Sequence, residues 1–212
     1  MNETTDAGFW DRTARKYVGA AVADQAGYAR TLGRTGDLLR AGDRVVELGC
    51  GTGSTAMTLG GAVRSYLATD ISPTMIAIAQ DRLAAAPVDG IEFRVATAAD
   101  LSRGAPAADA VLAFNVLHLV RDLDATLRHV RDMLGPDGLF VSKTPCVGDM
   151  SPLIRWAVLP AMRAVGRAPF VTVFDAGELR ARISDAGFEV LTVENHAGRG
   201  NDDRPFIVAR RR

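Results

Sequence analysis

The stretch from Val45 to Ser54 constrains the fold of this chain more than any other feature of the sequence. It begins as an apolar run of the right length for one strand and continues directly into the turn Gly49-Cys50-Gly51-Thr52-Gly53. Glycines at alternate positions permit backbone conformations that a Cβ would hinder, so a ligand can approach the turn closely. A helix that starts at about Gly53 would direct free N–H groups toward that ligand. The pattern therefore predicts a strand, a ligand-binding turn and a helix in succession.

Acidic residues stand at the ends of two apolar runs. Glu47 lies just before the first glycine, and Asp70 ends the next run, Tyr66 to Thr69. A carboxylate at the end of a second strand can accept hydrogen bonds from both hydroxyls of a ribose. Asp70 could instead cap the helix that opens near Pro73, but Ser72 already offers that cap. We therefore expect Asp70 to contact the ligand.

Apolar runs and helical patterns alternate through the centre of the chain. Strands are expected over Arg44–Cys50, Ser65–Ile71, Ile91–Ala96, Asp109–Phe114 and Leu139–Lys143. The intervening helices are expected from Gly53 to about Gly60, over Thr74–Ala86 and over Asp122–Leu134, the last stopped by Gly135-Pro136. Strands separated by helices predict a parallel sheet that is covered on both faces. Ligands bind to such sheets beyond the carboxyl ends of the strands.

The C-terminal part departs from this alternation. A helix over Asp175–Ala186, with Asp175 as its cap and Glu178 in the capping-box position, precedes two strands, Phe188–Glu194 and Pro205–Ala209. Strands that follow one another without a helix predict an antiparallel hairpin at one edge of the sheet. The fold class is therefore α/β: a seven-stranded, mostly parallel, doubly wound sheet with an antiparallel edge hairpin, N-terminal helices and a helical insertion after the fifth strand.

All 212 residues are expected to form one domain, since a chain of this length buries about 70% of its unfolded surface. Its parts are an N-terminal helical lid (1–40), a cofactor-binding core (41–145), a helical insertion that caps the substrate (146–174) and a C-terminal helix with edge strands (175–212). The lid reads as one or two helices over Thr13 to Arg40, broken near Gly33 or Gly36. The insertion contains the apolar helical stretch Leu153–Val165.

Charge and cysteine content exclude several classes of function. Lys and Arg together number 25, as do Asp and Glu, so the chain lacks the basic excess of most nucleic-acid-binding domains. Cys50 and Cys146 form neither a disulfide framework nor a zinc-ligand pattern, which indicates a cytoplasmic protein without a metal site. The start of the chain lacks the pattern of a signal peptide. The apolar stretch Trp156 to Val165 contains Pro160 and Arg163 and is too short to span a bilayer, so we expect no stable membrane insertion.

Several segments, in this order, resemble the S-adenosylmethionine-dependent methyltransferases of the Rossmann-like class. They are Phe9–Tyr17, Glu47–Gly53, Asp70–Met75, Asp109–His118 and Leu134–Leu139. The central motifs are similar to those of the small-molecule methyltransferases of ubiquinone and menaquinone synthesis. A lone glycine-rich turn would be weak evidence, whereas matching segments in the order of the family point to its cofactor. They carry little information about the substrate.

The resemblance implies S-adenosyl-L-methionine as the cofactor and gives roles to residues at the strand ends. Glu47 would hold the turn or the amino end of the cofactor, and Asp70 would accept from the ribose hydroxyls. Ile71 and Met75 would flank the adenine, although core packing explains Met75 equally well. The full expected set of cofactor-binding residues is Glu47, Gly49, Gly51, Gly53, Asp70, Ile71, Met75, Thr97, Ala98, Asn115 and Leu117.

One position departs from the pattern of the family. The family usually places an acidic residue after its third strand, where it accepts from the adenine amine, and Thr97 stands there in this chain. A threonine hydroxyl can still accept one hydrogen bond, and the Ala98 backbone can contact the ring. Asp100 matches a different, variable acidic position. We therefore expect adenine recognition to depend more on the backbone than is usual.

Methyl transfer from a sulfonium needs positioning and exclusion of water more than acid–base groups. A base matters only where the acceptor must lose a proton. His118 is the best candidate for that base, because it lies at the carboxyl edge of the sheet and histidine titrates near neutral pH; a structural histidine is the alternative. Tyr17 is the second catalytic candidate, in a segment where the resembled enzymes close an aromatic pair over the cofactor. Helix packing explains Tyr17 equally well.

The favoured function is methyl transfer from S-adenosylmethionine to a small, largely apolar molecule by direct in-line attack. The insertion supplies apolar side chains for such a substrate, and Asn115-Val116-Leu117-His118 lacks the Asn-Pro-Pro-Tyr pattern of enzymes that act on bases or glutamine. The alternative is a catalytically inactive S-adenosylmethionine-binding sensor or an accessory subunit of another methyltransferase, against which the intact glycines and Asp70 count. The glycine spacing disfavours a nicotinamide dehydrogenase. Expected partners are the small substrate and, in a homodimer, a second copy of the chain.

Overall fold

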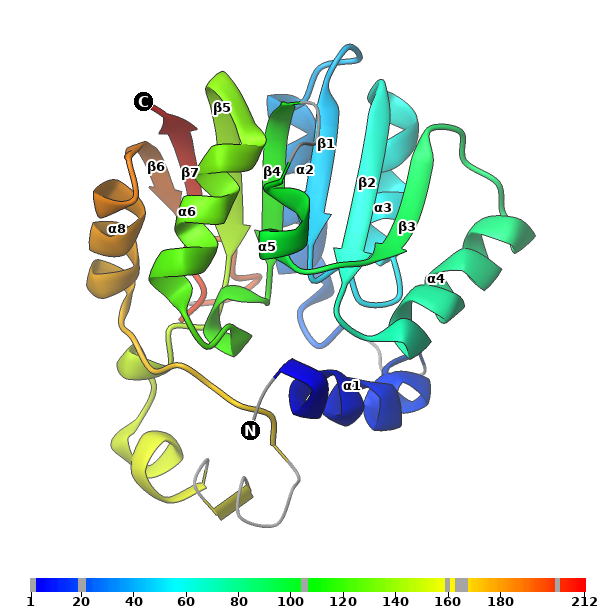
Figure 1. Ribbon diagram of the computed structural model, residues 1–212. Coiled ribbons are helices and arrows are strands. Elements are labelled where there is room, and N and C mark those ends of the chain that lie inside the picture. The colour runs from blue at the N-terminus through cyan, green and yellow to red at the C-terminus, as the bar shows by residue number, and fades with distance from the viewer. Residues whose placement is uncertain (1–2, 19–21, 104–106, 159–160, 163–167, 201–202) are drawn as a thin grey trace.

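The computed structural model describes residues 3–18, 22–103, 107–158, 161–162, 168–200 and 203–212. Within these ranges seven strands form one sheet in the order β3-β2-β1-β4-β5-β7-β6. They are β1 (Arg44–Leu48), β2 (Ser65–Asp70), β3 (Ile91–Val95), β4 (Ala108–Phe114), β5 (Leu134–Lys143), β6 (Phe188–Glu194) and β7 (Phe206–Arg211). In this sheet only β7 runs antiparallel to its neighbours, β5 and β6 (Figure 1). The predicted α/β class, with a mostly parallel sheet and an antiparallel edge hairpin, is confirmed.

Helices cover both faces of the sheet and its carboxyl edge (Figure 1). They are α1 (Glu3–Val18), α2 (Gln25–Leu38), α3 (Ser54–Leu59), α4 (Pro73–Ala85), α5 (Ala98–Leu101), α6 (Leu123–Met133) and α8 (Ala176–Asp185). α2, α3 and α4 pack on one face around Tyr66 and Phe93, while α5, α6 and α8 pack on the other around Phe140 and Phe188. α1 belongs to neither layer and lies across the carboxyl ends of the strands. One helix therefore covers the edge where ligands bind in sheets of this kind.

Capping residues define the helix ends nearest to that edge. Ser72 Oγ accepts the Met75 N–H at 3.1 Å and begins α4 just after β2. Asp122 accepts a backbone N–H of the first turn of α6 at 2.8 Å, shortly after β4. Asp175 and Glu178 form the predicted capping box of α8. Each cap satisfies donors that a helix N-terminus otherwise leaves unpaired.

The N-terminal region differs from the prediction of a helix break near Gly33 or Gly36. α1 begins upstream of Thr13, the predicted start, and α2 runs through both glycines. The N-terminus of α2 is defined by Asp24, whose side chain accepts the Gly27 N–H at 2.9 Å. Each glycine costs a helix interior about 1 kcal/mol relative to alanine. Tertiary contacts of α2 with the sheet outweigh that local preference.

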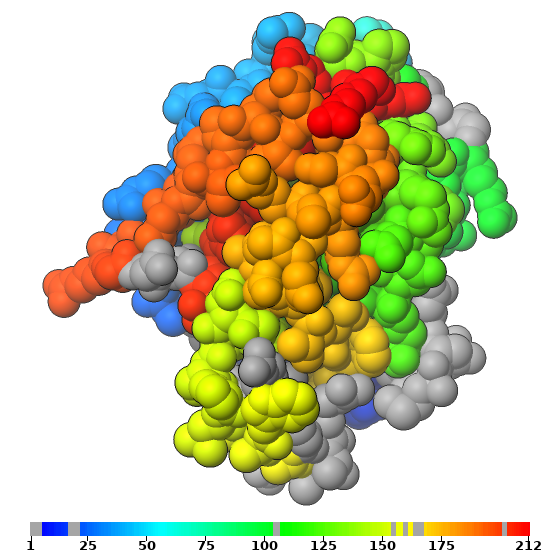
Figure 2. Space-filling view, turned by 90° about the vertical axis from the view of Figure 1, so that its left-hand side faces the viewer, coloured from blue at the N-terminus to red at the C-terminus, as the bar shows by residue number. Residues whose placement is uncertain are grey.

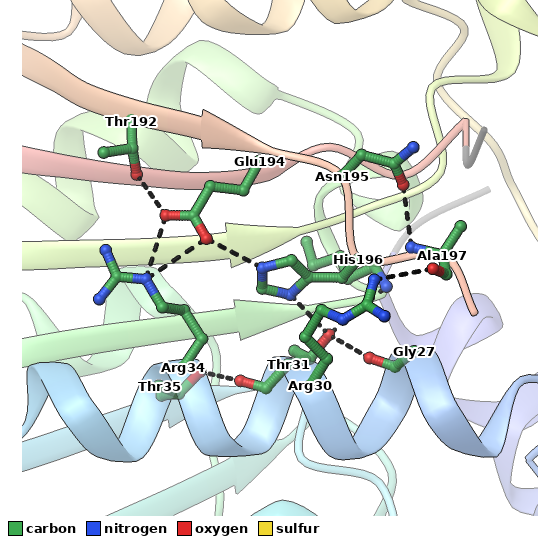
Figure 3. Close-up of polar contacts among 11 residues, drawn as sticks. Gly27, Arg30, Thr31, Arg34, Thr35, Thr192, Glu194, Asn195, His196 and Ala197 are labelled. Carbon is green, nitrogen blue, oxygen red and sulfur yellow. Dashed lines mark hydrogen bonds and ion pairs between the residues drawn. The ribbon is translucent and has the colours of Figure 1, made fainter. Parts of the chain in front are cut away.

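A buried polar network provides part of those contacts and holds α2 against the end of β6 (Figure 3). His196 is 2% exposed and stacks on Phe206, with the ring centroids 4.2 Å apart. Its two ring nitrogens lie 3.1 Å from Thr31 Oγ1 and 3.0 Å from Glu194 Oε2. Glu194 also accepts from Arg34 Nε at 3.1 Å. The helix is thus fixed by residues that are distant in the sequence, which local propensity cannot reveal.

β5 also begins earlier than expected. It starts at Leu134 rather than Leu139, because Leu134 pairs with Ala108 before the register shifts and Leu139 pairs with Ala110. Gly135-Pro136 ends α6 as predicted, yet the chain after it is already part of the sheet. Gly135-Pro136 therefore correctly predicted the end of α6. The early start of β5 was not predicted, because its first residues pair irregularly with β4 and show no regular strand pattern in the sequence.

The insertion after β5 projects from one end of the molecule (yellow in Figure 2). It contains the 3-10 turn η3 (Val147–Asp149) and the π-helical turn η4 (Ile154–Val158). The rest of the predicted helix Leu153–Val165 lies partly outside the described residues. Leu153 and Trp156 are 68% and 73% exposed, so this segment is not packed on the core. No helix in the described part of the chain has the length and apolarity that a bilayer crossing needs.

Candidate active site

A cavity of about 770 Å³ opens at the carboxyl edge of the sheet. It extends from the turn after β1, past the end of β2, to the segment after β4 that contains the 3-10 turn η2 (Leu117–Leu119). α1 contributes Asp6 and Trp10 to its wall. The predicted site residues that line it are Glu47, Gly49, Gly51, Asp70, Ile71, Met75, Thr97, Ala98, Asn115, Leu117 and His118. The predicted residues come from four separate segments, which meet around one space.

Two residues of the predicted site are not placed in this wall. Gly53 is buried and serves as the N-cap of α3. The Tyr17 side chain lies outside the described residues, so its catalytic role stays a prediction.

The three glycines of the turn are required for different reasons. Gly49, Gly51 and Gly53 have φ values of 67°, 55° and 79°, in a region that residues with a Cβ rarely adopt. A Cβ on Gly49 would lie 2.6 Å from the Val116 side chain, and one on Gly53 would lie 2.6 Å from the Phe93 ring. A Cβ on Gly51 would meet no protein atom within 4 Å. Packing thus requires Gly49 and Gly53, whereas Gly51 leaves open space beside the backbone.

Asp70 holds the turn in this conformation. One of its carboxylate oxygens accepts the Gly51 N–H at 3.0 Å, and the other accepts the Ser72 N–H at 2.9 Å. Burial raises the pKa of Asp70, against the lowering effect of the backbone N–H groups. The cap of α4 is Ser72, as the sequence indicated, which leaves the Asp70 carboxylate at the cavity wall.

Glu47 places a second carboxyl group in the same wall. The residue is 2% exposed, and the Tyr66 hydroxyl donates to Oε2 at 2.9 Å. Burial raises the pKa of Glu47 to about 7, against the lowering effect of hydrogen bonds from Tyr66 and Thr55. A cation in the cavity would favour the ionised form of this carboxyl group. The turn therefore presents both open space and a carboxyl group that titrates near neutral pH.

Thr97 has a local role that the sequence analysis missed. It caps α5: its hydroxyl donates to Asp100 Oδ2 at 2.8 Å, and Oγ1 accepts the Asp100 N–H at 3.3 Å. The Thr97 N–H donates in return to the Asp100 carboxylate at 2.9 Å. The Thr-x-x-Asp spacing was a usable signal for this capping box. The hydroxyl proton is therefore committed within the loop, and only an oxygen lone pair is left for a ligand.

Met75 is both a core residue and a cavity residue. It is 2% exposed, packs at the start of α4 and borders the cavity. The two alternatives that the sequence left open for it are thus compatible.

His118 lines the cavity on the side of β4. Its Nδ1 lies 3.2 Å from Thr144 Oγ1, and Thr144 is fully buried. Burial, together with the charge of Arg204, lowers the pKa of His118 to about 4. The imidazole is therefore neutral near pH 7 and can accept a proton there. The contact with Thr144 also gives the ring a structural role, so the two alternatives for His118 coexist.

Sequence reasoning missed a group of charged and aromatic residues in the wall. Arg121 Nε and Nη2 donate to the two carboxylate oxygens of Asp6 at 2.7 and 2.8 Å. The guanidinium carbon of Arg121 lies 4.4 Å from the centre of the Phe170 ring. Trp10 stands inside the N-terminal segment already singled out, so its position was a usable signal. Asp6 and Arg121 are 115 residues apart, and no local pattern links them.

Comparisons with known proteins indicate the family to which the chain belongs. A family model described as a methyltransferase domain matches residues 21–193. The 27-O-demethylrifamycin SV methyltransferase of Amycolatopsis mediterranei is 30% identical over 206 residues, which cover 91% of this chain and 69% of that enzyme. A highly reducing polyketide synthase of Penicillium soppii is 33% identical over 189 residues, which cover 79% of this chain. The chain spans only 7% of the length of that synthase.

Among solved structures, magnesium protoporphyrin IX methyltransferase from Synechocystis PCC 6803, crystallised with S-adenosylhomocysteine, is similar in fold. The TM-score is 0.74 at 17% identity, and the match covers 99% of each chain. The likeness at this identity concerns the arrangement of the sheet and helices.

Proposed function

The chain belongs to the methyltransferase domain family, and we propose that it transfers a methyl group from S-adenosylmethionine to a small, largely apolar acceptor. The methyl donor is the one implied by the motifs around the glycine turn. S-adenosylhomocysteine, which is the donor without its methyl group, is bound in the structural neighbour from Synechocystis. The identity of the acceptor, the direct in-line transfer and the roles of single residues are parts of the proposal.

The observation that carries the proposal is the continuity of the cavity from the glycine turn to His118. Open space beside Gly51 would admit a ligand that approaches the backbone, which a Cβ would prevent. The carboxyl groups of Glu47 and Asp70 suit the ammonium and the ribose hydroxyls of the donor. The residues present therefore fit this cofactor.

The binding roles follow the order of the strands. Glu47 and the backbone of the turn would hold the amino acid end of the donor, and Asp70 would accept from its ribose. The adenine would lie against Ile71, Met75, Thr97 and Ala98, and the end nearest to the acceptor would lie against Asn115 and Leu117. Thr97 Oγ1 keeps one lone pair for the adenine amine, and backbone carbonyl groups would supply the other acceptor.

When bound, the cofactor supplies an electrophilic methyl group on a sulfonium, which a nucleophile displaces in line. The protein would orient the acceptor, exclude water and, for a hydroxyl or thiol acceptor, take up the proton that is lost. His118 is placed to take up that proton, because its neutral ring borders the cavity, but with a pKa of about 4 it does not retain the proton at neutral pH. α1 would serve as a lid over the donor, and the insertion would cap the acceptor.

The acceptor side of the cavity favours an apolar molecule. Its wall there includes Trp10, Leu119, Pro145, Pro169 and Phe170. Apolar and aromatic walls with few polar groups bind ligands mainly by burial of apolar surface. Two of the relatives are named as a rifamycin methyltransferase and a polyketide synthase, which supports a polyketide-like acceptor.

Two measurements test the proposal. In isothermal titration we expect one binding site for S-adenosylmethionine and for S-adenosylhomocysteine, and none for NAD. Transfer of a labelled methyl group to a panel of phenols, thiols and amines then tests turnover. Binding of NAD alone would overturn the cofactor assignment. Donor binding without transfer to any member of the panel would instead favour a non-catalytic sensor.

A further inference from the structure

α1 lies across the carboxyl ends of the strands (Figure 1), contributes Asp6 and Trp10 to the cavity wall, and is fixed by two side-chain contacts. On the side of β2, Asp11 Oδ1 accepts from Ser72 Oγ at 2.6 Å, at the start of α4. On the side of β4, the Asp6 carboxylate accepts two hydrogen bonds from Arg121. Trp10, between these anchors in the sequence, borders the cavity. The helix is therefore attached at two points with the cavity between them.

Arg121 also contacts a third segment, through the face of its guanidinium group. The Phe170 ring lies 4.4 Å away, within the range of cation–π attraction. Thr172 fastens the same segment to the loop that precedes Arg121: its N–H donates to the His118 carbonyl at 2.8 Å, and its hydroxyl donates to the Val120 carbonyl at 2.7 Å. One side chain thus joins α1, the loop after β4 and the end of the insertion.

We propose that Arg121 is a positioning residue that couples α1 to segment 168–174, so that both close over the cavity together. We call Asp6, Arg121 and Phe170 the clasp. A guanidinium group suits this task, because its edge pairs with a carboxylate through two hydrogen bonds while its flat face stacks on an aromatic ring. A lysine ammonium cannot make both contacts with the same geometry.

The position of the clasp links it to the proposed function, on which this inference rests. All three clasp residues border the same cavity as His118. A ligand that favours the closed arrangement of one segment then favours the contacts of the other, and the coupling is reciprocal. Donor binding should therefore order segment 168–174 even though that segment lies on the acceptor side.

The clasp is not expected to stabilise the fold as a whole. The side chains of Arg121 and Asp6 are 31% and 13% exposed, and ion pairs with solvent access contribute little to global stability. Variants of the clasp should therefore remain folded. A second Arg–Asp pair, away from the cavity, provides a control: Arg182 Nη1 lies 2.9 and 3.0 Å from the two Asp124 oxygens, between α8 and α6.

Hydrogen–deuterium exchange of the full chain, with and without S-adenosylhomocysteine, tests the coupling. In the wild type the ligand should slow exchange in both α1 and segment 168–174. Arg121→Gln should weaken ligand binding roughly fivefold or more and remove the ligand-dependent protection of both segments. Arg121→Lys should give a smaller loss, and Asp6→Asn combined with Arg121→Gln should be no worse than Arg121→Gln alone. Arg182→Gln should leave binding and exchange unchanged.

Two results would overturn the clasp. One is an Arg121→Gln variant whose affinity stays within twofold of the wild type and whose two segments keep their protection. The other is an Arg121→Gln variant that loses the ligand-dependent protection of segment 168–174 but keeps that of α1. If the wild type does not bind S-adenosylhomocysteine, the proposed function fails. The clasp can then be tested on the ligand-free protein. Arg121→Gln should speed hydrogen–deuterium exchange in both α1 and segment 168–174, and unchanged exchange in either one would overturn the clasp.

Discussion

The two halves of the cavity are built in different ways. On the side of β1 and β2 the wall consists of the segments that follow these two strands, and hydrogen bonds to backbone N–H groups hold them in place. Asp70 fixes the N–H groups of Gly51 and Ser72, and Glu47 is buried beneath Tyr66. Such a wall is rigid, because it is built largely from backbone atoms, which substitutions of side chains do not replace.

On the side of β4 the wall consists of side chains from distant segments. Arg121 joins Asp6 to Phe170, and His118 is held by Thr144. Single substitutions can reshape such a wall without disturbing the sheet. We propose a division of labour, in which the β1–β2 half recognises the donor and the β4 half selects the acceptor. Variants in one half should therefore leave the function of the other intact, except at the clasp, where Arg121 couples the two halves.

Gly51→Val should have the largest effect, confined to the donor half. The branched side chain would fill the open space beside the turn and would need a φ of about 55°, which residues with a Cβ rarely adopt. We expect S-adenosylhomocysteine binding to become undetectable by calorimetry while the protein stays folded. A Cβ on Gly33 meets no atom within 4 Å and lies on α2, so Gly33→Ala serves as the control. Normal binding by Gly51→Val would show that the turn does not contact the donor.

His118→Ala should have the next largest effect, confined to the acceptor half. With an acceptor that must lose a proton, kcat should fall by roughly 10²–10⁴-fold with little change in donor affinity. The lowered pKa of His118, about 4, moves the expected pH dependence: kcat should be level from about pH 5 upward and should fall below about pH 4, where the ring is protonated. An unchanged kcat would leave His118 with its structural role beside Thr144.

Asp70→Ala should have an intermediate effect in the donor half. Loss of hydrogen bonds to a charged group should weaken donor binding by about 1.5–3 kcal/mol, while kcat at saturating donor changes less. Asp124→Ala is a suitable control, because Asp124 pairs with Arg182 between α6 and α8 and does not border the cavity. Equal affinities of the wild type and Asp70→Ala in calorimetry would remove Asp70 from the ribose role.

The smallest effect should be a pH dependence of donor binding that originates at Glu47. Burial raises the pKa of Glu47 to about 7, so the carboxyl group is protonated below that pH in the free protein. A cationic donor favours the ionised form, and binding should release a proton below pH 7. Affinity should then fall by up to about tenfold for the first pH unit below 7 and be level above it.

Calorimetry in two buffers of different ionisation enthalpy measures this proton release. Glu47→Gln should bind with no proton release and no slope between pH 6 and 7. The same slope in Glu47→Gln would assign the titration to another group. The pKa of His118 is about three units lower than that of Glu47. A change of donor affinity near pH 7 that Glu47→Gln removes therefore comes from the donor half and not from His118.

The same difference explains what could be predicted from the sequence. The strand, the glycine turn and Asp70 lie within one continuous stretch, so their spacing already indicated the ligand-binding edge and the fold. The α5 cap at Thr97 was also local, but its Thr-x-x-Asp signal was overlooked because Thr97 was considered only as a ligand contact. Local patterns were therefore sufficient to predict which residues after β1 and β2 line the cavity.

The acceptor half and the N-terminal helices were less predictable, because long-range contacts define them. The extent of α2 through Gly33 depends on Glu194 and His196, which follow it by more than a hundred residues. The Asp6–Arg121 pair depends on where α1 is placed over the sheet. Even His118, which the sequence did single out, has its pKa lowered by burial, and burial cannot be read from the neighbouring residues.

The most direct test of the division between the two halves is a crystal structure with S-adenosylhomocysteine bound. Our account predicts the ribose at Asp70, the amino acid end beside Glu47 and Gly51, and the sulfur directed toward the part of the cavity bordered by His118. A ligand with its ribose away from Asp70, or with its sulfur directed away from His118, would contradict the assignment of donor and acceptor halves.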